Sequence, residues 1–298
     1  GYIVDPDPAK PEVQEAFNSR AITSFARHSR LGYTNLSSAA EVEEDFMKSV
    51  DYLRSLGYQR ITLKTGSYGM EALAMSIKYA SKAGLDLLTI DGSGGGTGMS
   101  PWNMMEAWGV PSIFLHSKAY EYAKILADRG EQVVDLSFAG GLAREDHIFK
   151  ALALGAPFVK SICMGRSLMI PGFLGSNIEG VFNPDKRAEL NSHWEKLPNG
   201  VTSVGTYPEE IFAGYHDLQL KVGAEEMKNI PFGAIAAWTL SDKLAAGLQQ
   251  FMAGARKFKL SEITRADVFS ANRETEEETG IKFLTDVQDE EARGILEN

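Results

Sequence analysis

Short apolar runs recur along the middle of the chain at nearly regular spacing. Helical patterns separate them; in residues 70–80, for example, Leu73, Ile77 and Ala80 fall on one face. Strands that alternate with single helices, at about 25 residues per unit, predict a parallel sheet with its helices packed outside. The five predicted strands are residues 61–64, 85–90, 112–116, 133–138 and 158–163.

This alternation is typical of a (β/α)8 barrel of the TIM type, within the α/β class. We expect the chain to hold about the last five strands of such a barrel, plus a helical C-terminal extension. Because eight units close a barrel, the missing strands would come from upstream sequence or from another chain. Three segments are expected: a helical lead-in over residues 1–58, the C-terminal part of the barrel over 59–175, and an irregular segment with C-terminal helices and an acidic tail over 176–298.

Helices are predicted on both sides of the barrel segment. Residues 11–28 and 40–56 have amphipathic patterns, and Ser37 and Ser38 are candidate N-caps of the second helix. Residues 235–257 and 261–270 have helical patterns as well, and the tail from Arg273 onward is strongly acidic. We therefore expect the barrel to be flanked by helices, with a solvated helix or arm at the C-terminal end.

Composition and charge narrow the function classes. The chain has 298 residues and a net charge of −10, without a long basic run, which argues against nucleic acid and anionic membrane as partners. No apolar stretch approaches the roughly 20 residues that span a bilayer, and no signal-peptide pattern opens the sequence. Cys163, the single cysteine, excludes a disulfide framework and a cysteine-ligated iron–sulfur cluster within this chain. The single cysteine and the lack of a membrane span or signal peptide lead us to expect a cytoplasmic protein. The histidines lack metal-site spacing, so we expect no metal.

The most distinctive motif is the glycine-rich stretch of residues 91–101, which follows the predicted strand 85–90. Glycines allow positive φ angles and let a ligand approach backbone N–H groups closely. The carboxyl ends of strands are also where α/β proteins bind ligands. The stretch therefore predicts a ligand-binding turn; a long turn that only leads into a helix is the alternative.

Five motifs in order carry a resemblance to a known family. They are Lys64 on a strand; Gly95-Gly96-Thr97-Gly98-Met99-Ser100-Pro101; Gly140-Gly141-Leu142 followed by Asp146; Leu154-Gly155-Ala156; and Gly165-Arg166. Together they resemble the flavin-binding synthase domain of glutamate synthase over residues 64–168, with weaker similarity over 248–268. An ordered set of motifs is more specific than any one glycine motif.

The resemblance implies an FMN-dependent oxidoreductase that reduces 2-iminoglutarate, formed from 2-oxoglutarate and ammonia, to glutamate. It implies that Lys64 is catalytic, as a cation near the flavin N1 and O2 edge where negative charge builds up. It further implies a dicarboxylate substrate and an electron-donor or amidotransferase partner. The implied cofactor-binding residues are Lys64, Gly95, Gly96, Gly140, Gly141, Gly165 and Arg166, and the implied substrate-binding residues are Ser93, Thr97 and Ser100.

The sequence departs from the family pattern at three places. Ala139 stands where the family usually has an aspartate for the ribityl hydroxyls, and Ser93 and Gly94 replace a His-Asp pair. No cysteine cluster follows Arg166, so flavin reduction would need another donor. Two alternatives therefore stay open: a non-catalytic, degenerate barrel in an assembly or regulatory role, and an FMN oxidoreductase with another substrate, as in IMP dehydrogenase-like barrels.

Individual residues also have simpler interpretations. Lys64 could be a surface lysine at a strand end, and Gly140-Gly141 a tight turn without a ligand. His116, at the end of a predicted strand, is either an acid or base at the barrel mouth or, more simply, a polar residue where a strand stops.

Overall fold

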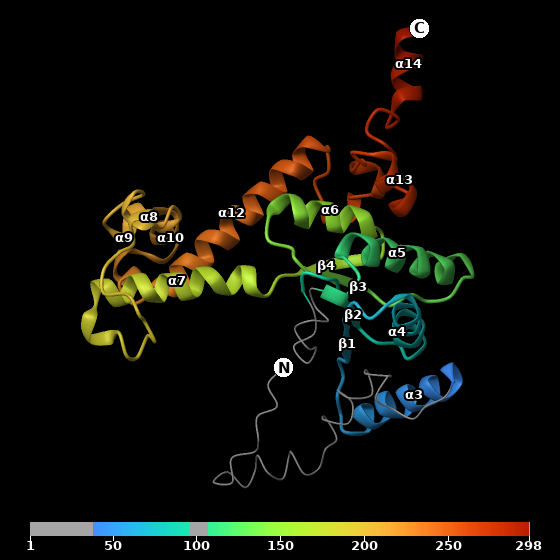
Figure 1. The fold of residues 1–298 in the computed structure, drawn as a ribbon, viewed down its shortest axis with the longest axis horizontal. Coiled ribbons are helices and arrows are strands. Elements are labelled where there is room, and N and C mark those ends of the chain that lie inside the picture. Colours follow the sequence, from blue (N-terminus) through green and yellow to red (C-terminus); the bar gives the residue numbers. More distant parts are fainter. Residues whose placement is uncertain (1–37, 96–106, 298) are drawn as a thin grey trace. The chain divides into compact units, whose positions relative to one another are not determined.

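The computed structural model describes residues 38–95 and 107–297, and the predicted helix 11–28 and the candidate cap Ser37 lie outside this range. Contacts divide the chain into two compact units (Figure 1). Among the described residues, the first unit holds those up to Gly141, Lys150–Cys163 and those from Ile263 onward; the second holds Leu142–Phe149 and Met164–Glu262.

Helix α3 (Ala39–Ser55) opens the described part of the chain and confirms the predicted helix 40–56. Ser38 is its N-cap in a capping box: the Ser38 hydroxyl accepts from the backbone N–H of Glu41, and the Glu41 carboxylate accepts from the N–H of Ser38. Glu43 on α3 forms ion pairs with Lys78 and Lys82. These contacts attach α3 to the next helix, α4 (Met70–Lys82), on which Leu73, Ile77 and Ala80 are buried as predicted.

The first unit is built on a parallel four-stranded sheet with the order β1-β2-β3-β4, so each strand lies beside the one before it in sequence. Four of the five predicted strands are confirmed within the described residues, and the α/β class with them. The strands are β1 (Thr62–Thr65), β2 (Leu87–Asp91), β3 (Leu136–Ala139) and β4 (Val159–Cys163). The helices that link them are α4, α5 (Ser112–Asp128) and α6 (Glu145–Gly155).

The predicted strand 112–116 is wrong, because these residues form the first turns of α5. The buried positions Leu115, Ala119, Ala123 and Leu126 recur at helical spacing from this run to the end of α5. Five residues are too few to separate a strand from a helix by periodicity alone. Pro111 precedes the first helical residue, where its missing N–H costs no intrahelical hydrogen bond.

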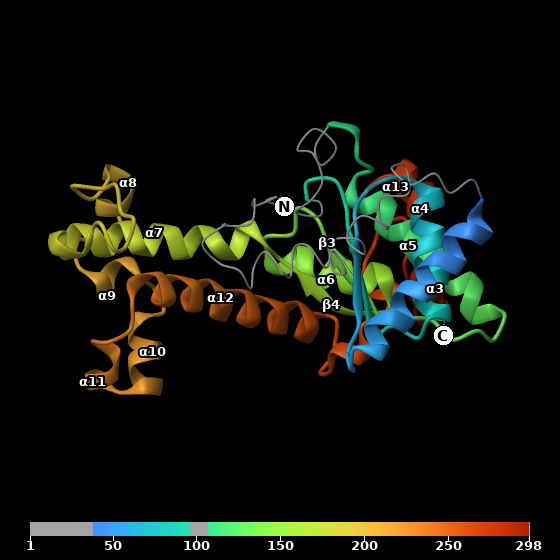
Figure 2. The ribbon, with the colours of Figure 1, turned by 90° about the horizontal axis from the view of Figure 1, so that it is seen from below.

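The two faces of the sheet differ in chemistry. Ile90 and Phe138 are in register on β2 and β3 and fully buried, and the ring of His116 on α5 stacks on Phe138 at 4.0 Å between centroids. This apolar face is the one that the helices cover, and Figure 2 shows α4 and α5 on the same side of the sheet. Because side chains alternate along a strand, the opposite face carries the polar positions Lys64, Thr89, Asp91, Ser137, Ser161 and Cys163.

The second unit is helical. Its two long helices, α7 (Arg166–Phe182) and α12 (Phe232–Gly254), pack closely through glycines: a Cβ at Gly175 would lie 2.4 Å from the Phe232 carbonyl oxygen. The predicted helix 235–257 is thus confirmed by α12, whereas α7 was not predicted. Between them lie η3 (Pro184–Lys186), α8 (Asn199–Thr202), α9 (Pro208–Ile211), α10 (Tyr215–Val222) and α11 (Ala224–Met227).

Residues 261–270 do not form the predicted continuous helix. They contain the end of one 3-10 turn, η4 (Leu260–Glu262), and a second turn, η5 (Arg265–Asp267). The Thr264 hydroxyl and backbone N–H both engage the Asp267 carboxylate, which closes a capping box around η5 and interrupts the helical path.

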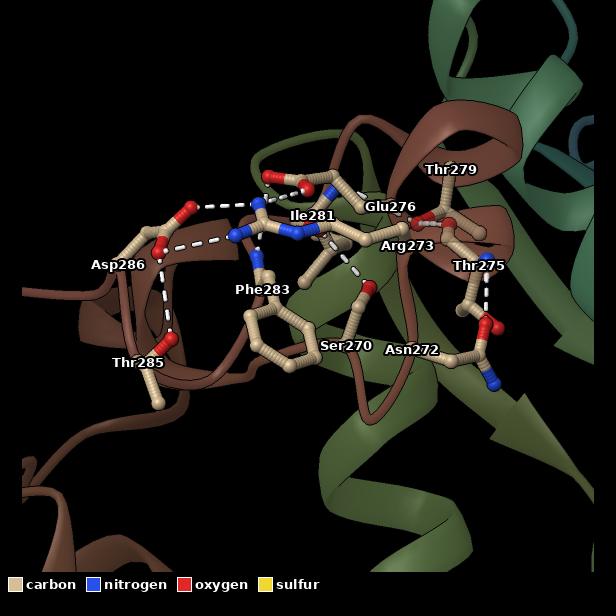
Figure 3. Close-up of polar contacts among 10 residues, drawn as sticks. All are labelled: Ser270, Asn272, Arg273, Thr275, Glu276, Thr279, Ile281, Phe283, Thr285 and Asp286. Carbon is tan, nitrogen blue, oxygen red and sulfur yellow. Dashed lines mark hydrogen bonds and ion pairs between the residues drawn. The ribbon is translucent and has the colours of Figure 1, made fainter.

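The acidic tail forms two short helices, α13 (Arg273–Thr279) and α14 (Asp289–Glu297). Figure 3 shows how α13 is fixed: Asn272 accepts from the N–H of Thr275, and the Arg273 guanidinium is paired with the carboxylates of Glu276 and Asp286. The Ser270 hydroxyl donates to the carbonyl of Ile281 in the same cluster. Ser117 on α5 also donates to the Thr279 carbonyl, so α13 is fixed both by contacts within the tail and by contacts with the rest of the first unit.

Candidate functional site

The candidate site lies at the carboxyl edge of the sheet, where the turns after β1, β2 and β3 meet. Lys64 on β1 and Asp91 at the end of β2 form an ion pair of 2.8 Å between Nζ and Oδ2. The carboxylate is buried, with 5% of the Asp91 side chain exposed, whereas 47% of the Lys64 side chain is exposed. Register explains the pairing: Lys64 is opposite Thr89, and Asp91 follows two residues later on the same face.

The glycine turns after β2 and β3 pack directly against each other. A Cβ at Gly140 would lie 2.5 Å from the Gly92 carbonyl oxygen, and a Cβ at Gly95 would lie 2.4 Å from Asp91 Oδ1. The Ser112 hydroxyl, at the start of α5, lies 2.7 Å from the Gly140 carbonyl oxygen and 3.1 Å from that of Ser93, so its proton is shared between the two turns. These glycines are required because backbone and carboxylate occupy the space of a side chain.

At two other glycines a Cβ would meet no steric clash. Gly141 has a φ of +72°, and the nearest atom to a Cβ there would be 4.0 Å away; Gly94 has a φ of +96° and makes only ordinary contact with Gly141. Within the described residues, neither Gly140 nor Gly141 donates its N–H to another protein group. Successive free N–H groups with positive φ angles form a concavity that suits an anion such as phosphate.

The polar face continues toward β4. The Ser137 hydroxyl lies 3.1 Å from the Ser161 carbonyl oxygen and 3.2 Å from the Cys163 sulfur, so the thiol can donate to a hydroxyl that itself donates to Ser161. Ala139 is in register between Asp91 and Cys163. The alanine therefore leaves a gap in a row of polar side chains, directly beside the buried carboxylate of Asp91.

His116 does not belong to the site, so the hypothesis of an acid or base at a strand end is wrong. It lies within α5, 2% exposed, on the face of the sheet that the helices cover, and its Nε2 donates to the Ile90 carbonyl oxygen at 3.2 Å. Burial lowers the pKa of His116 to about 4, although hydrogen bonds to the carbonyls of Ile90 and Ala139 favour the protonated ring. The imidazole is therefore neutral at physiological pH and packs as part of the core.

The structure brings together some of the predicted site residues and separates others. Lys64, Ser93, Gly95, Gly140 and Gly141 all lie at the sheet edge of the first unit. The other predicted residues are Gly165 and Arg166, which lie at the start of α7 in the second unit, and Gly96, Thr97 and Ser100, which lie outside the described residues.

The motifs at this sheet edge lie within a region that matches a known family. A family model described as the conserved region in glutamate synthase matches residues 23–172. The chain belongs to the glutamate synthase family. The match includes Lys64, both glycine turns and the start of α7, so the family resemblance drawn from residues 64–168 is confirmed and extends further toward the amino terminus. No curated protein matches the chain.

Two other kinds of site have no candidate among the described residues. In the described part of the chain, no helix has both the length and the apolar character that a bilayer span requires. Likewise, across residues 38–95 and 107–297, no group of three or more His, Cys, Asp or Glu side chains is placed to hold a metal ion.

Sequence reasoning missed Asp91 and Ser112 as members of the site. Asp91 was counted as the first residue of the glycine stretch, but it is the last residue of β2 and the partner of Lys64. Ser112 was assigned to a strand. A signal for Asp91 existed, because a carboxylate that ends an apolar run must find a cation or hydrogen-bond donors.

Proposed function

We propose that this chain is part of a cytoplasmic FMN-dependent oxidoreductase of the glutamate synthase type, which reduces a 2-imino or 2-oxo dicarboxylate to glutamate or a similar amino acid. Family membership suggests an oxidoreductase. The observation that carries the proposal is Lys64, which is ion-paired with Asp91 at the carboxyl edge of the sheet.

The proposed fold is a (β/α)8 barrel of which β1 to β4 form one sector. Sequential parallel strand order and helices packed on one face of the sheet fit a barrel sector. A doubly wound sheet would instead reverse its strand order and carry helices on both faces. The outer edges of β1 and β4 would pair with strands from upstream sequence or another chain, and the division at residues 58 and 175 stays a prediction.

The residues present suit FMN at two points. Lys64 offers a half-exposed ammonium whose remaining donors are free to approach an electron-rich ring edge. Gly140 and Gly141 offer N–H groups that bond to no other protein group in the described part of the chain, which suits a phosphate. The role of Gly165 and Arg166 as further phosphate donors stays a prediction. The Gly95 position supports the site indirectly, because its missing side chain lets the Asp91 carboxylate lie against the turn.

When bound, reduced FMN would supply hydride to the substrate carbon. The contribution of the chain is electrostatic and positional: Lys64 would hold positive charge where negative charge develops, and the Ser112 hydroxyl would keep the two glycine turns in fixed relation. Ser93, Thr97 and Ser100 would donate to the substrate carboxylates. Because no cysteine cluster follows Arg166, the electrons would come from a partner subunit or another donor, and the nitrogen from ammonia or an amidotransferase.

Flavin uptake tests the proposal. The purified protein is incubated with FMN and desalted, and the retained flavin is quantified by its visible absorbance and by mass spectrometry. Lys64→Met should weaken binding of reduced FMN by about tenfold, the scale of one lost charged contact. Lys160→Met is the matched control, because Lys160 is also a strand lysine but donates to the Pro157 carbonyl.

Turnover is the second step of this test. Chemically reduced protein is mixed with 2-oxoglutarate and ammonium, and the glutamate formed is measured. Flavin retention with glutamate formation supports the full proposal, and flavin retention without it points to another substrate. Failure to retain FMN refutes the flavoprotein proposal.

A non-catalytic barrel with an assembly role is the second candidate function. Ala139 favours it, because an alanine between Asp91 and Cys163 supplies no hydrogen bond to a ribityl chain. Failure of flavin uptake, together with a stable complex between this chain and a partner subunit, would favour this candidate.

A further inference from the structure

The carboxylate of Asp91 is the most deeply buried charge at the sheet edge. Its side chain is 5% exposed, and its Oδ2 lies 2.8 Å from Lys64 Nζ. Its other oxygen, Oδ1, lies against Gly95, since a Cβ at that position would be only 2.4 Å away. Asp91 therefore lies between the lysine on β1 and the glycine turn after β2, and a shift of the carboxylate would move both.

A buried carboxylate needs its partner. Removal of one member of a buried ion pair leaves an uncompensated charge, which is strongly unfavourable. Asp91 consequently restrains an ammonium that would otherwise move on a flexible four-carbon stem. One of the three N–H donors of Lys64 is used by Asp91, which leaves the others for a ligand.

Thr89 indicates independently that the polar face takes a ligand. It is in register with Lys64 on one side and with Ser137 on the other, and it is 8% exposed. Within the described residues, no protein group forms a hydrogen bond with the Thr89 hydroxyl. Buried hydroxyls almost always have a partner, so a ligand at this face would satisfy one that the protein leaves unsatisfied.

We propose that Asp91 is a positioning residue for Lys64: it fixes the ammonium at the carboxyl edge of the sheet and offsets its charge. This inference rests on the proposed flavin site. Without Asp91, the full charge of Lys64 would act on the bound ring and favour the reduced flavin. With Asp91, the pair is neutral and the reduction potential of the flavin is kept lower. Asp91 would thus tune the potential through Lys64.

The test compares the affinities for oxidised and reduced FMN in three variants. Asp91→Asn should favour the reduced form by about tenfold relative to wild type, which corresponds to about +30 mV for a two-electron couple. Lys64→Gln should shift the ratio in the opposite direction. The double variant removes both charges and should return close to the wild-type ratio, a pattern that general damage to the fold would not produce.

Asp86→Asn is the matched control. Asp86 is an acidic residue near the amino end of β2, and its carboxylate accepts from the N–H of Ile61. This substitution should leave the ratio unchanged. A urea-unfolding double-mutant cycle on the flavin-free protein gives a second readout, in which Asp91 and Lys64 should be coupled.

The outcomes separate the two levels of the argument. Wild-type protein that takes up no flavin overturns the proposed function and this inference with it. Flavin uptake with an unchanged potential in Asp91→Asn overturns only the inference. Should Asp91→Asn not fold, the double variant decides: a wild-type ratio supports the inference, and the ratio of Lys64→Gln alone overturns it.

Discussion

Replacement of His116 by phenylalanine should remove a pH-dependent part of the stability of the sheet. The imidazole is buried between α5 and the sheet, where it stacks on Phe138 and donates to the Ile90 carbonyl. Its pKa is lowered from 6.5 to about 4 by burial. In the unfolded chain the ring binds a proton below about pH 6.5, whereas in the folded protein it does so only near pH 4. The contribution of His116 to the free energy of unfolding is therefore fully present above pH 6.5 and is lost as the pH falls toward 4.

The magnitude follows from the size of the shift. One pKa unit corresponds to about 1.4 kcal/mol, so the full window is worth about 3 kcal/mol. Between pH 7.5 and 5.5 the expected loss is about 1.3 kcal/mol by the same linkage. Hydrogen bonds lower the pKa of carboxylates such as Glu43 and Asp286 from values of 4.5 and 3.8. These carboxylates therefore lose their contributions to the free energy of unfolding only below about pH 5.5. The interval from 7.5 to 5.5 therefore isolates the histidine.

The assay must report on the first unit alone. We would measure urea unfolding at pH 7.5 and 5.5 by pulsed hydrogen exchange of peptides that cover β2 and β3. Wild type should lose stability between the two pH values, whereas His116→Phe should start about 1 kcal/mol lower, from the lost hydrogen bond, and show little further loss. His216→Phe, at an exposed position in the second unit, is the control. Parallel losses in wild type and His116→Phe would refute the assigned burial of the ring.

Three further sets of substitutions test other contacts. Gly140→Ala should destabilise the first unit by about 3 kcal/mol, because its φ is positive and a Cβ would meet Gly92. Gly141→Ala should cost only about 1 kcal/mol, since only the φ penalty applies. Equal urea midpoints for the two variants would contradict this difference. Ser38→Ala should cost about 1 kcal/mol and accelerate hydrogen exchange in the first turn of α3. Arg265→Met should cost about 2 kcal/mol in urea unfolding, because the guanidinium donates to the carbonyls of Leu154 and Thr279, whereas the exposed Arg129→Met should change little.

The strand pattern could be predicted because β1 to β4 are apolar runs bounded by turn residues. Helix α3 was equally clear, since Ser38 and Glu41 form a capping box that is readable in sequence. The run 112–116 was wrongly predicted as a strand, because its buried positions extend a helical period that only a longer window shows. Helix α7 was hidden by Pro171 and its glycines, which normally interrupt helices.

The site was harder to predict than the fold, because it depends on register. Lys64 and Asp91 are 27 positions apart in sequence and meet only because Lys64 is opposite Thr89 in the sheet. Periodicity places each residue on a strand but does not say which positions become neighbours. The role of Ser112 has the same origin, since its hydroxyl reaches two turns only when α5 begins at that residue.

The glycines at the sheet edge divide into two groups that answer different requirements. Gly92, Gly95 and Gly140 are needed by the protein itself, because a Cβ at each would collide with Ser112, Asp91 or backbone. Gly141 meets almost nothing, so only its backbone angle and its free N–H explain a glycine there. A glycine-rich motif therefore does not mark one continuous cradle. At this edge the first group holds the two turns together, and the proposed ligand-facing part is limited to the turn after β3 and to Lys64, the partner of Asp91.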